Sequence, residues 1–347
     1  MGQLEEGAVL ICIGLIGIVG NLVAIPYFGS RIPRQKTFYM LLTCLSICDL
    51  VVVVSGLFLY GIPKVSDSYA IRTYYIIAPY VFPMFEIGCT GSIYFTVAIS
   101  IERYFVVCRP FWYFAQSILP QVFIVPIYCF AVVYNIPKFF EIRTVVLQNN
   151  NTTVSETDLV NETTIIYDVQ DTVVMINATN VQYIFEPTEM RKNVYYYGIY
   201  HIGCEMVFQF IAPLFILVFA NLSILTQLIK YNSGPPDVSI GEGINQGNTT
   251  TYQPPNQQRC RQKQVDRAKV TLAICKIFIF CHLFKWVLNI YELYMRCKNY
   301  TLSEEEIEKI IYETQWFDKV VTISNTLVVL NSSINFYVYV LKDVCTK

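Results

Sequence analysis

The chain has 347 residues, of which 54% are hydrophobic and only 15% are charged, and its mean hydropathy is +0.44. This is more apolar side chain than a water-exposed surface can cover, so the composition indicates a protein embedded in a bilayer. The net charge of −1 argues against a nucleic-acid partner, which would require a basic face to neutralise phosphates.

Seven apolar runs are long enough to cross a bilayer as helices. They lie at about 8–28, 38–60, 74–106, 119–137, 195–229, 268–294 and 316–341. Polar or turn-rich sequence bounds each run. We therefore expect an all-α protein in which 1–347 form a single seven-transmembrane helix bundle.

The first loop sets the expected orientation. Arg31, Arg34 and Lys36 lie between the first two spans, whereas no basic residue precedes the first span. By the positive-inside rule the N-terminus is then outside, and an odd number of spans places the C-terminus inside.

A long loop at 138–192 is extracellular in this topology. It carries glycosylation sequons at Asn150, Asn151, Asn161 and Asn177. Glycans are added only on the lumenal side, so a glycosylatable loop here agrees with the orientation.

A second long loop, at 231–264, is intracellular in the same topology. It is rich in Gly, Pro, Asn and Gln and ends in a basic run, Arg259 to Lys269. We expect a disordered linker that becomes helical at its basic end, because it has few apolar side chains to offset the entropy of ordering. The basic run is either a topology signal alone or a contact for anionic membrane lipid.

Asp49 lies in the middle of the second span, in L-S-I-C-D-L. The surrounding Val and Leu residues cannot solvate a carboxylate. An ionisable group at that depth marks a functional site by default, and the alternative is a neutral acid that is hydrogen-bonded for packing.

The third span ends in an adjacent acid and base, Glu102 and Arg103, followed by Tyr104. A charged pair at the foot of a membrane helix is costly in lipid, so it should face the bundle interior or an aqueous cavity. In the alternative interpretation both side chains extend to the membrane interface.

These motifs, together with Gly20-Asn21, Pro213 and the N-S-S-I-N-F-Y-V-Y ending of the last span, resemble those of rhodopsin-like G-protein-coupled receptors. The resemblance implies a sodium pocket formed by Asp49, Ser92, Asn331 and Asn335, and no other cofactor.

The same resemblance implies a conformational latch. Arg103 pairs with Glu102 at rest and moves on activation to contact a heterotrimeric G protein, with Tyr104 and Tyr339 as further residues of the coupling region. The basic run before the sixth span could then also contact the G protein.

The chain departs from the family pattern in three places. His282 and Phe284 stand where the sixth span of the family has Trp and Pro, and Phe336 replaces the proline of the seventh-span motif. The family disulfide between the third helix and the second outer loop has neither of its cysteines here, because none occurs near Ala78 or within 138–203.

Four polar residues, Glu86, Glu205, His282 and Lys285, lie in the outer halves of spans three, five and six. Glu86 is about 25 Å along the helix from Arg103 at 1.5 Å per residue. The acids and the base either neutralise one another or form a ligand pocket that receives a cationic group, with an arginine as the first candidate. Both interpretations hold if a cationic group of the ligand replaces the base in its ion pair with an acid.

Within the family, the stretches E-R-Y-F-V-V-C-R-P and Y-N-I-P-K-F-F-E are similar to those of invertebrate FMRFamide and related neuropeptide receptors. This similarity implies a multi-pass plasma-membrane receptor for a short amidated peptide, which activates a G protein and is not an enzyme. A small-molecule chemosensory receptor is the alternative within the same fold.

The sequence also bears on three other classes of membrane protein. A zinc-dependent membrane hydrolase lacks ligands, since His201 and His282 are the only histidines. An ion-coupled transporter would use Asp49 and the pocket charges, but inverted repeats or broken helices are not evident. A ligand-binding membrane protein that does not signal stays open, because activation is transmitted through the altered sixth and seventh spans.

Overall fold

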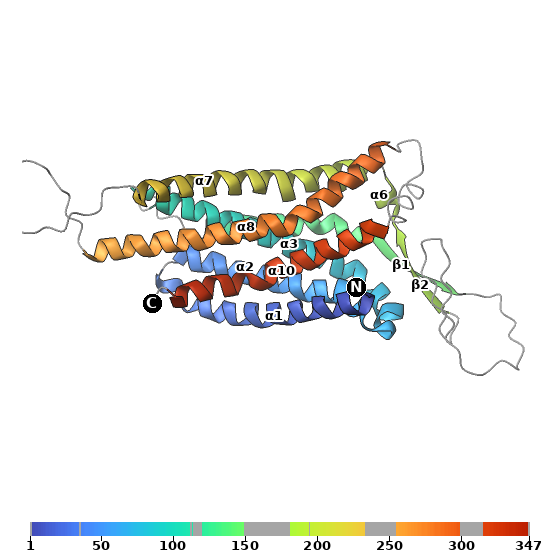
Figure 1. Ribbon diagram of the computed structural model, residues 1–347. Helices are drawn as coiled ribbons and strands as arrows, with labels where there is room; N and C mark the ends of the chain where they lie inside the picture. The colour runs from blue at the N-terminus through green and yellow to red at the C-terminus, as the bar shows by residue number, and fades with distance from the viewer. Residues whose placement is uncertain are drawn as a thin grey trace, which may run out of the picture.

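The structure is a computed structural model that describes residues 2–34, 36–111, 113, 120–148, 181–193, 195–232, 255–298 and 315–345. Its long helices are α1 (Gln3–Gly29), α2 (Lys36–Gly56), α3 (Tyr74–Cys108), α5 (Gln121–Asn135), α7 (Ala212–Asn232), α8 (Pro255–Lys298) and α10 (Gln315–Cys345). These helices lie side by side in one bundle (Figure 1).

Short helical turns lengthen or connect the long helices. They are η1 (Ile32–Arg34), η2 (Leu57–Gly61), η3 (Ile62–Lys64), η4 (Tyr69–Thr73), η5 (Ile136–Phe140), α6 (Glu189–Lys192), η6 (Tyr196–Cys204) and η7 (Met206–Ile211). The turns η6 and η7 are π-helical and are separated only by Glu205. Such turns are rare and concentrate at functional sites.

Six helical segments of the described chain are long and apolar enough to cross a membrane. They are Gln3–Gly29, Lys36–Lys64, Tyr69–Cys108, Gln121–Phe140, Tyr196–Gln227 and Lys269–Tyr291. The seventh predicted run, 316–341, lies within α10, which packs against α1, α2 and α8. The helix α8 already begins at Pro255, so the basic end of the predicted inner loop is helical.

Two strands form a hairpin at one end of the bundle (Figure 1). The strands β1 (Ile142–Gln148) and β2 (Val181–Pro187) pair antiparallel, with Ile142 opposite Pro187 and Gln148 opposite Val181. Both lie in the stretch that the sequence predicts only as a long loop. The N-terminus lies at this hairpin end and the C-terminus at the opposite end, which we call the Arg103 end.

The helix α3 lies at the centre of the bundle and packs on α2, α5, α7 and α8. Glycines allow two of the closest approaches. A Cβ at Gly91 of α3 would meet Cys48 of α2 at 2.6 Å, and one at Gly17 of α1 would meet Ser333 of α10 at 2.2 Å. Small residues at membrane helix contacts let backbones come close, and here they draw four helices together around Asp49.

Candidate functional site

Asp49 is completely buried between α2, α3 and α10. The Ser92 hydroxyl donates to one carboxylate oxygen at 2.6 Å, and the Asn335 amide donates to the other at 2.8 Å. The structure thus brings together three residues that the sequence placed in one pocket. Asn331, the fourth, is buried one turn before Asn335 on α10.

Several buried oxygens beside this cluster have no hydrogen-bond partner among the described residues. They are the Oδ1 atoms of Asn21, Asn331 and Asn335. The Asn21 amide nitrogen donates to the Ser332 carbonyl at 2.9 Å, which joins α1 to α10 beside Asp49. Buried polar atoms are usually satisfied, and a carboxylate with hydroxyl and amide oxygens is the donor set that hard cations prefer.

Glu102 and Arg103 are both buried, with side chains only 2% and 0% exposed. Arg103 Nη2 donates to Glu102 Oε1 at 2.6 Å, and its Nε pairs with the other carboxylate oxygen. The Tyr113 hydroxyl donates to Oε1 at 3.0 Å. The pair therefore lies inside the bundle, in the arrangement expected of the resting latch, and does not extend to the membrane interface.

Aromatic rings connect Arg103 to α10. The Arg103 guanidinium lies 4.1 Å from the centre of the Phe38 ring. The Phe38 ring in turn lies 6.2 Å from that of Tyr339, in an edge-on contact. Tyr104 contacts a different helix, with its ring 5.8 Å from that of Phe219 on α7.

Near the hairpin end, a four-charge network joins Glu86, Lys138, Glu205 and Lys285. Lys138 Nζ lies 3.0 Å from Glu86 and 3.9 Å from Glu205. Lys285 Nζ lies 3.2 Å from Glu86 and 3.4 Å from Glu205. Two acids and two bases balance, so the mutual neutralisation considered from the sequence is present, with Lys138 as a member that the sequence analysis missed.

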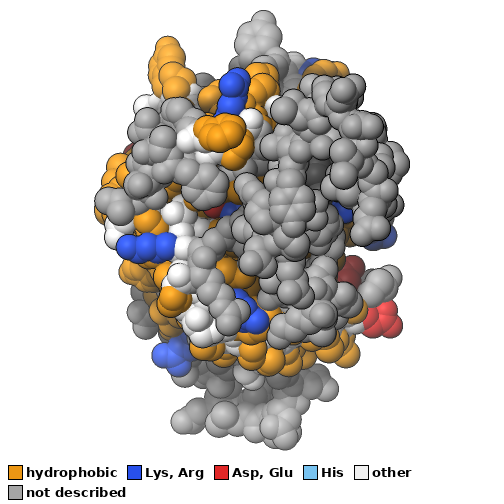
Figure 2. Space-filling model, turned by 90° about the vertical axis from the view of Figure 1, so that its left-hand side faces the viewer, with side chains coloured by type: hydrophobic (Ala, Val, Ile, Leu, Met, Phe, Trp, Pro, Cys, Tyr) orange, Lys and Arg blue, Asp and Glu red, His pale blue; other side chains and the backbone are white. Residues whose placement is uncertain are grey.

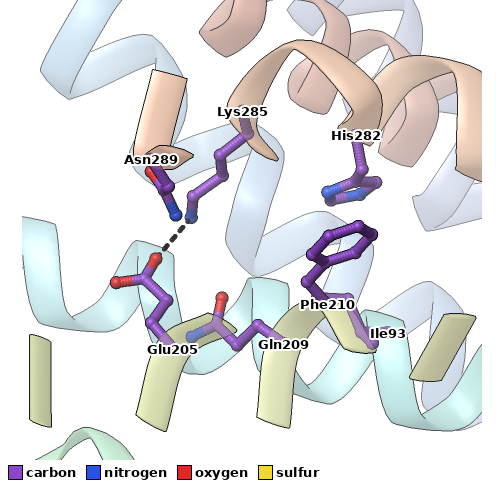
Figure 3. A pocket seen from close by; sticks show the side chains of 7 residues that line it. All are labelled: Ile93, Glu205, Gln209, Phe210, His282, Lys285 and Asn289. Atoms are coloured by element: carbon purple, nitrogen blue, oxygen red, sulfur yellow. Dashed lines mark ion pairs between the residues drawn. The ribbon is translucent and has the colours of Figure 1, made fainter. Parts of the chain in front are cut away.

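A small pocket opens beside this network (Figure 3). Its lining consists of Ile93, Glu205, Gln209, Phe210, His282, Lys285 and Asn289. Glu205 and Lys285 face each other across it, and the ring of His282 packs 4.4 Å from that of Phe278. Gln209 is buried, and its Nε2 has no hydrogen-bond partner among the described residues. Glu86 belongs to the network but does not line this pocket.

A second charged cluster, the hairpin clasp, closes the base of the hairpin. Glu141 directly precedes β1 and is buried. It pairs with Arg191 at 2.7 Å, accepts from the Tyr196 hydroxyl at 2.8 Å and lies 3.8 Å from His201. The Thr188 amide, just after β2, donates to the Glu141 carbonyl at 2.9 Å.

Glu141 is charged in this setting. Burial opposes ionisation, but the neighbouring His201 and Arg191 outweigh it and lower the pKa of Glu141 to about 2. A buried carboxylate that is paired and hydrogen-bonded stays ionised. The clasp therefore holds a true charge pair at neutral pH.

The hairpin also contacts the start of α3. The Thr144 hydroxyl donates to the Tyr75 carbonyl. The Phe185 ring lies 4.6 Å from that of Tyr75 and 5.6 Å from that of Tyr74. Ring pairs at such distances attract one another, so the hairpin is fixed to α3 without a covalent bond.

The family model for the seven-transmembrane receptors of the rhodopsin family matches residues 20–339. The chain belongs to this family. It is a multi-pass receptor of the plasma membrane, and the seven-helix fold expected from the sequence is confirmed. Members of the family are receptors and not enzymes.

Three relatives are similar to this receptor over nearly its whole length. An FMRFamide receptor of Drosophila melanogaster is 25% identical over 345 residues, which cover 96% of this chain and 51% of the relative. An FMRFamide peptide receptor of Caenorhabditis elegans is 24% identical over 97% of this chain and 66% of its own length. A probable G-protein coupled receptor of the same nematode is 22% identical over 96% of this chain and 74% of its own. The chain thus spans about half to three quarters of these relatives.

Four predicted site residues of the receptor lie outside the described residues. They are the sequon asparagines Asn150, Asn151, Asn161 and Asn177.

Sequence reasoning missed Lys138, Glu141 and Phe38. Lys138 directly follows the predicted fourth span, in the motif Y-N-I-P-K, and its position beside a span boundary is the one signal that could have indicated it. Nothing in the sequence pattern pointed to Phe38 as a partner of Arg103.

Proposed function

We propose that this chain is a receptor for an extracellular peptide that activates a heterotrimeric G protein, with the hairpin end outside the cell. One observation carries the proposal. The helix α3 carries Glu86 of the four-charge network near the hairpin end and the buried Glu102–Arg103 pair near the opposite end. A receptor of this family needs a ligand site and a coupling site connected by rigid helices. Two of the three relatives are FMRFamide receptors, which favours a peptide ligand.

The charges at the two ends support this orientation. Figure 2 shows the Arg103 end, where lysine and arginine side chains are spaced around the surface. Lys36 at the start of α2 and Arg109 after α3 are among the exposed ones. Basic residues favour the cytoplasmic side. In the sequence, the sequons at Asn150 and Asn161 lie between β1 and β2, the two strands at the other end.

Activation then follows as a population shift. Bound peptide favours the conformation in which the helical segments carrying Glu205 and Lys285 have moved, and the resting arrangement of Arg103 becomes less populated. In that resting arrangement Arg103 is fully buried against Glu102 and Phe38. A buried guanidinium cannot reach a G protein, so coupling requires its release.

We also propose that the Asp49 cluster holds a sodium ion that stabilises the resting conformation. The carboxylate of Asp49, the Ser92 hydroxyl and the free amide oxygens of Asn331 and Asn335 supply only hard oxygen donors. One negative charge among neutral oxygens suits a monovalent cation. The ion would supply charge balance for Asp49 and would take no part in any reaction.

The test is G-protein activation in cells that express the chain, challenged with a panel of amidated peptides that includes Arg-Phe-amide sequences. Surface labelling is measured in parallel. A response that disappears in Arg103→Ala, but not in Arg72→Ala, an exposed arginine near the hairpin end, is the expected result. Silence of a surface-exposed wild type towards every peptide, with a response to small molecules, would refute the peptide ligand.

A further inference from the structure

The two lysines of the four-charge network differ in how firmly they are enclosed. The Lys138 side chain is 1% exposed and comes from η5, a short connecting turn. The Lys285 side chain is 22% exposed, comes from α8 and lines the pocket opposite Glu205 (Figure 3). Only Lys285 can therefore leave the acids towards the space that a ligand enters.

The network is internally neutral, and this limits what can bind to it. A cationic group that entered beside Glu205 would leave an excess positive charge among buried groups, which is costly. The excess disappears if Lys285 moves away as the cation arrives. A guanidinium is the better partner for a carboxylate, because it makes two parallel charge-assisted hydrogen bonds where an ammonium acts as a point charge.

We infer that Lys285 occupies, in the resting receptor, the place that a cationic side chain of the ligand takes on binding. The inference rests on the proposed peptide function and gives the site a ligand chemistry, a guanidinium or ammonium group on a peptide. Lys285 is then an internal competitor, and its removal makes the site more attractive to a cationic ligand. A residue that merely contacts the ligand would have the opposite effect.

The same exchange connects binding to the helices that carry the signal. Lys285 of α8 contacts Glu86 of α3 and Glu205 at the junction of η6 and η7. These two ion pairs hold α8 against its neighbours near the hairpin end. Displacement of Lys285 removes both at once, while Lys138 keeps α3 connected to the segment that carries Glu205. The ligand thereby frees α8 without dismantling the rest of the site.

The experiment uses two matched amidated peptides that differ only in arginine or citrulline, which has nearly the same shape and no charge. Both are tested on wild type, on Lys285→Met and on Lys276→Met, which removes an exposed lysine from the same helix. Surface labelling corrects for expression. We expect Lys285→Met to increase the potency of the arginine peptide about tenfold or more relative to the citrulline peptide, and to raise basal signalling. Lys276→Met should change neither.

A second variant protects the test against misfolding. Lys285→Met leaves one uncompensated acid, whereas the double variant Lys285→Met with Glu205→Gln is again neutral. The double variant should reach the surface and lose the preference for arginine. An unchanged arginine-to-citrulline ratio in Lys285→Met, or a fall in potency for both peptides, overturns the inference and leaves the peptide receptor standing. A wild type that responds to neither peptide overturns both.

Discussion

Glu102 and Arg103 are neighbours on one helix, whereas the four-charge network gathers its members from α3, η5, the junction of η6 and η7, and α8. The first cluster can form wherever α3 is a helix. The second exists only when the whole bundle has assembled. An ion pair between residues close in sequence suits a switch that breaks and reforms. An ion pair between residues distant in sequence depends on the relative positions of the helices that carry them. The predictions that follow test this contrast.

The largest effect is expected at Glu86, which both lysines of the network contact. In Glu86→Ala, Lys138 and Lys285 face one remaining acid, and removal of one partner from a buried ion pair costs about 3 kcal/mol or more. We expect a lower melting temperature of the detergent-solubilised receptor and reduced surface expression. Lys138→Met combined with Glu86→Gln, which restores neutrality, should recover most of the loss. Equal instability of the single and double variants would show that charge balance is not what matters.

The hairpin clasp should be the next most sensitive region. Arg191→Gln removes the cation that pairs with buried Glu141 at 2.7 Å, and hydrogen bonds to charged groups contribute about 2 kcal/mol. Backbone hydrogen exchange in β1 and β2 should become faster. Arg143→Gln is the matched control, because its pair with Glu186 lies in the same hairpin with the arginine 63% exposed, and exposed pairs contribute under about 1 kcal/mol.

Acid should weaken the clasp in a defined range. The pKa of Glu141 is lowered from 4.5 to about 2, so its charge stabilises the folded loop at neutral pH. That contribution is fully present above 4.5 and is lost as the pH falls from there towards 2. Hydrogen exchange of the strands, corrected for the intrinsic pH effect, measures this loss. A clasp that already opens between pH 7 and 5 would contradict it.

A smaller effect is expected at Tyr113, whose hydroxyl donates to Glu102. Tyr113→Phe keeps the ring and removes this bond, which contributes about 1 kcal/mol, or about fivefold in the ratio of active to resting receptor. Basal G-protein activation should rise accordingly. Tyr80→Phe, at an exposed tyrosine of α3, the helix that carries Glu102, should leave it unchanged. A basal activity that falls in Tyr113→Phe would exclude Tyr113 as a restraint on the resting pair.

The smallest change in stability is expected at Asp49, between the two charged ends. Asp49→Asn preserves the shape, and its neighbours Ser92 and Asn335 can still hydrogen-bond to an amide, so stability should change by less than about 1 kcal/mol. Its functional effect should nevertheless be distinct. Agonist binding in sodium chloride and in choline chloride should differ for the wild type and agree for the variant. A sodium response that persists in Asp49→Asn would remove the proposed ion from this site.

The contrast between local and distant pairs also decides what the sequence could predict. The seven apolar runs were sufficient to predict the helices. The adjacency of Glu102 and Arg103 was sufficient to predict that they pair. Asp49, Ser92 and Asn335 were grouped through the family resemblance, since they lie on three helices and no local pattern relates them. The structure brings these three together.

The other residues could not be predicted because their roles depend on tertiary contacts. Lys138 is three residues before Glu141, yet one belongs to the network beside Glu86 and the other to the hairpin clasp. The sequence shows two charged residues at the edge of a loop and gives no reason to assign them to different clusters. The strands were missed for a related reason, because their pairing partners are separated by the long stretch 149–180, and hairpin signals in sequence rely on short turns.

The attachment of the hairpin has a practical consequence. No cysteine occurs within 138–203, so charge pairs, hydrogen bonds and ring contacts hold the strands to α3 and to η6. Such an attachment forms without an oxidant and is insensitive to thiol reagents, while high salt and strong acid weaken it. Production of the receptor in a reducing compartment should therefore preserve the position of the hairpin at the start of α3.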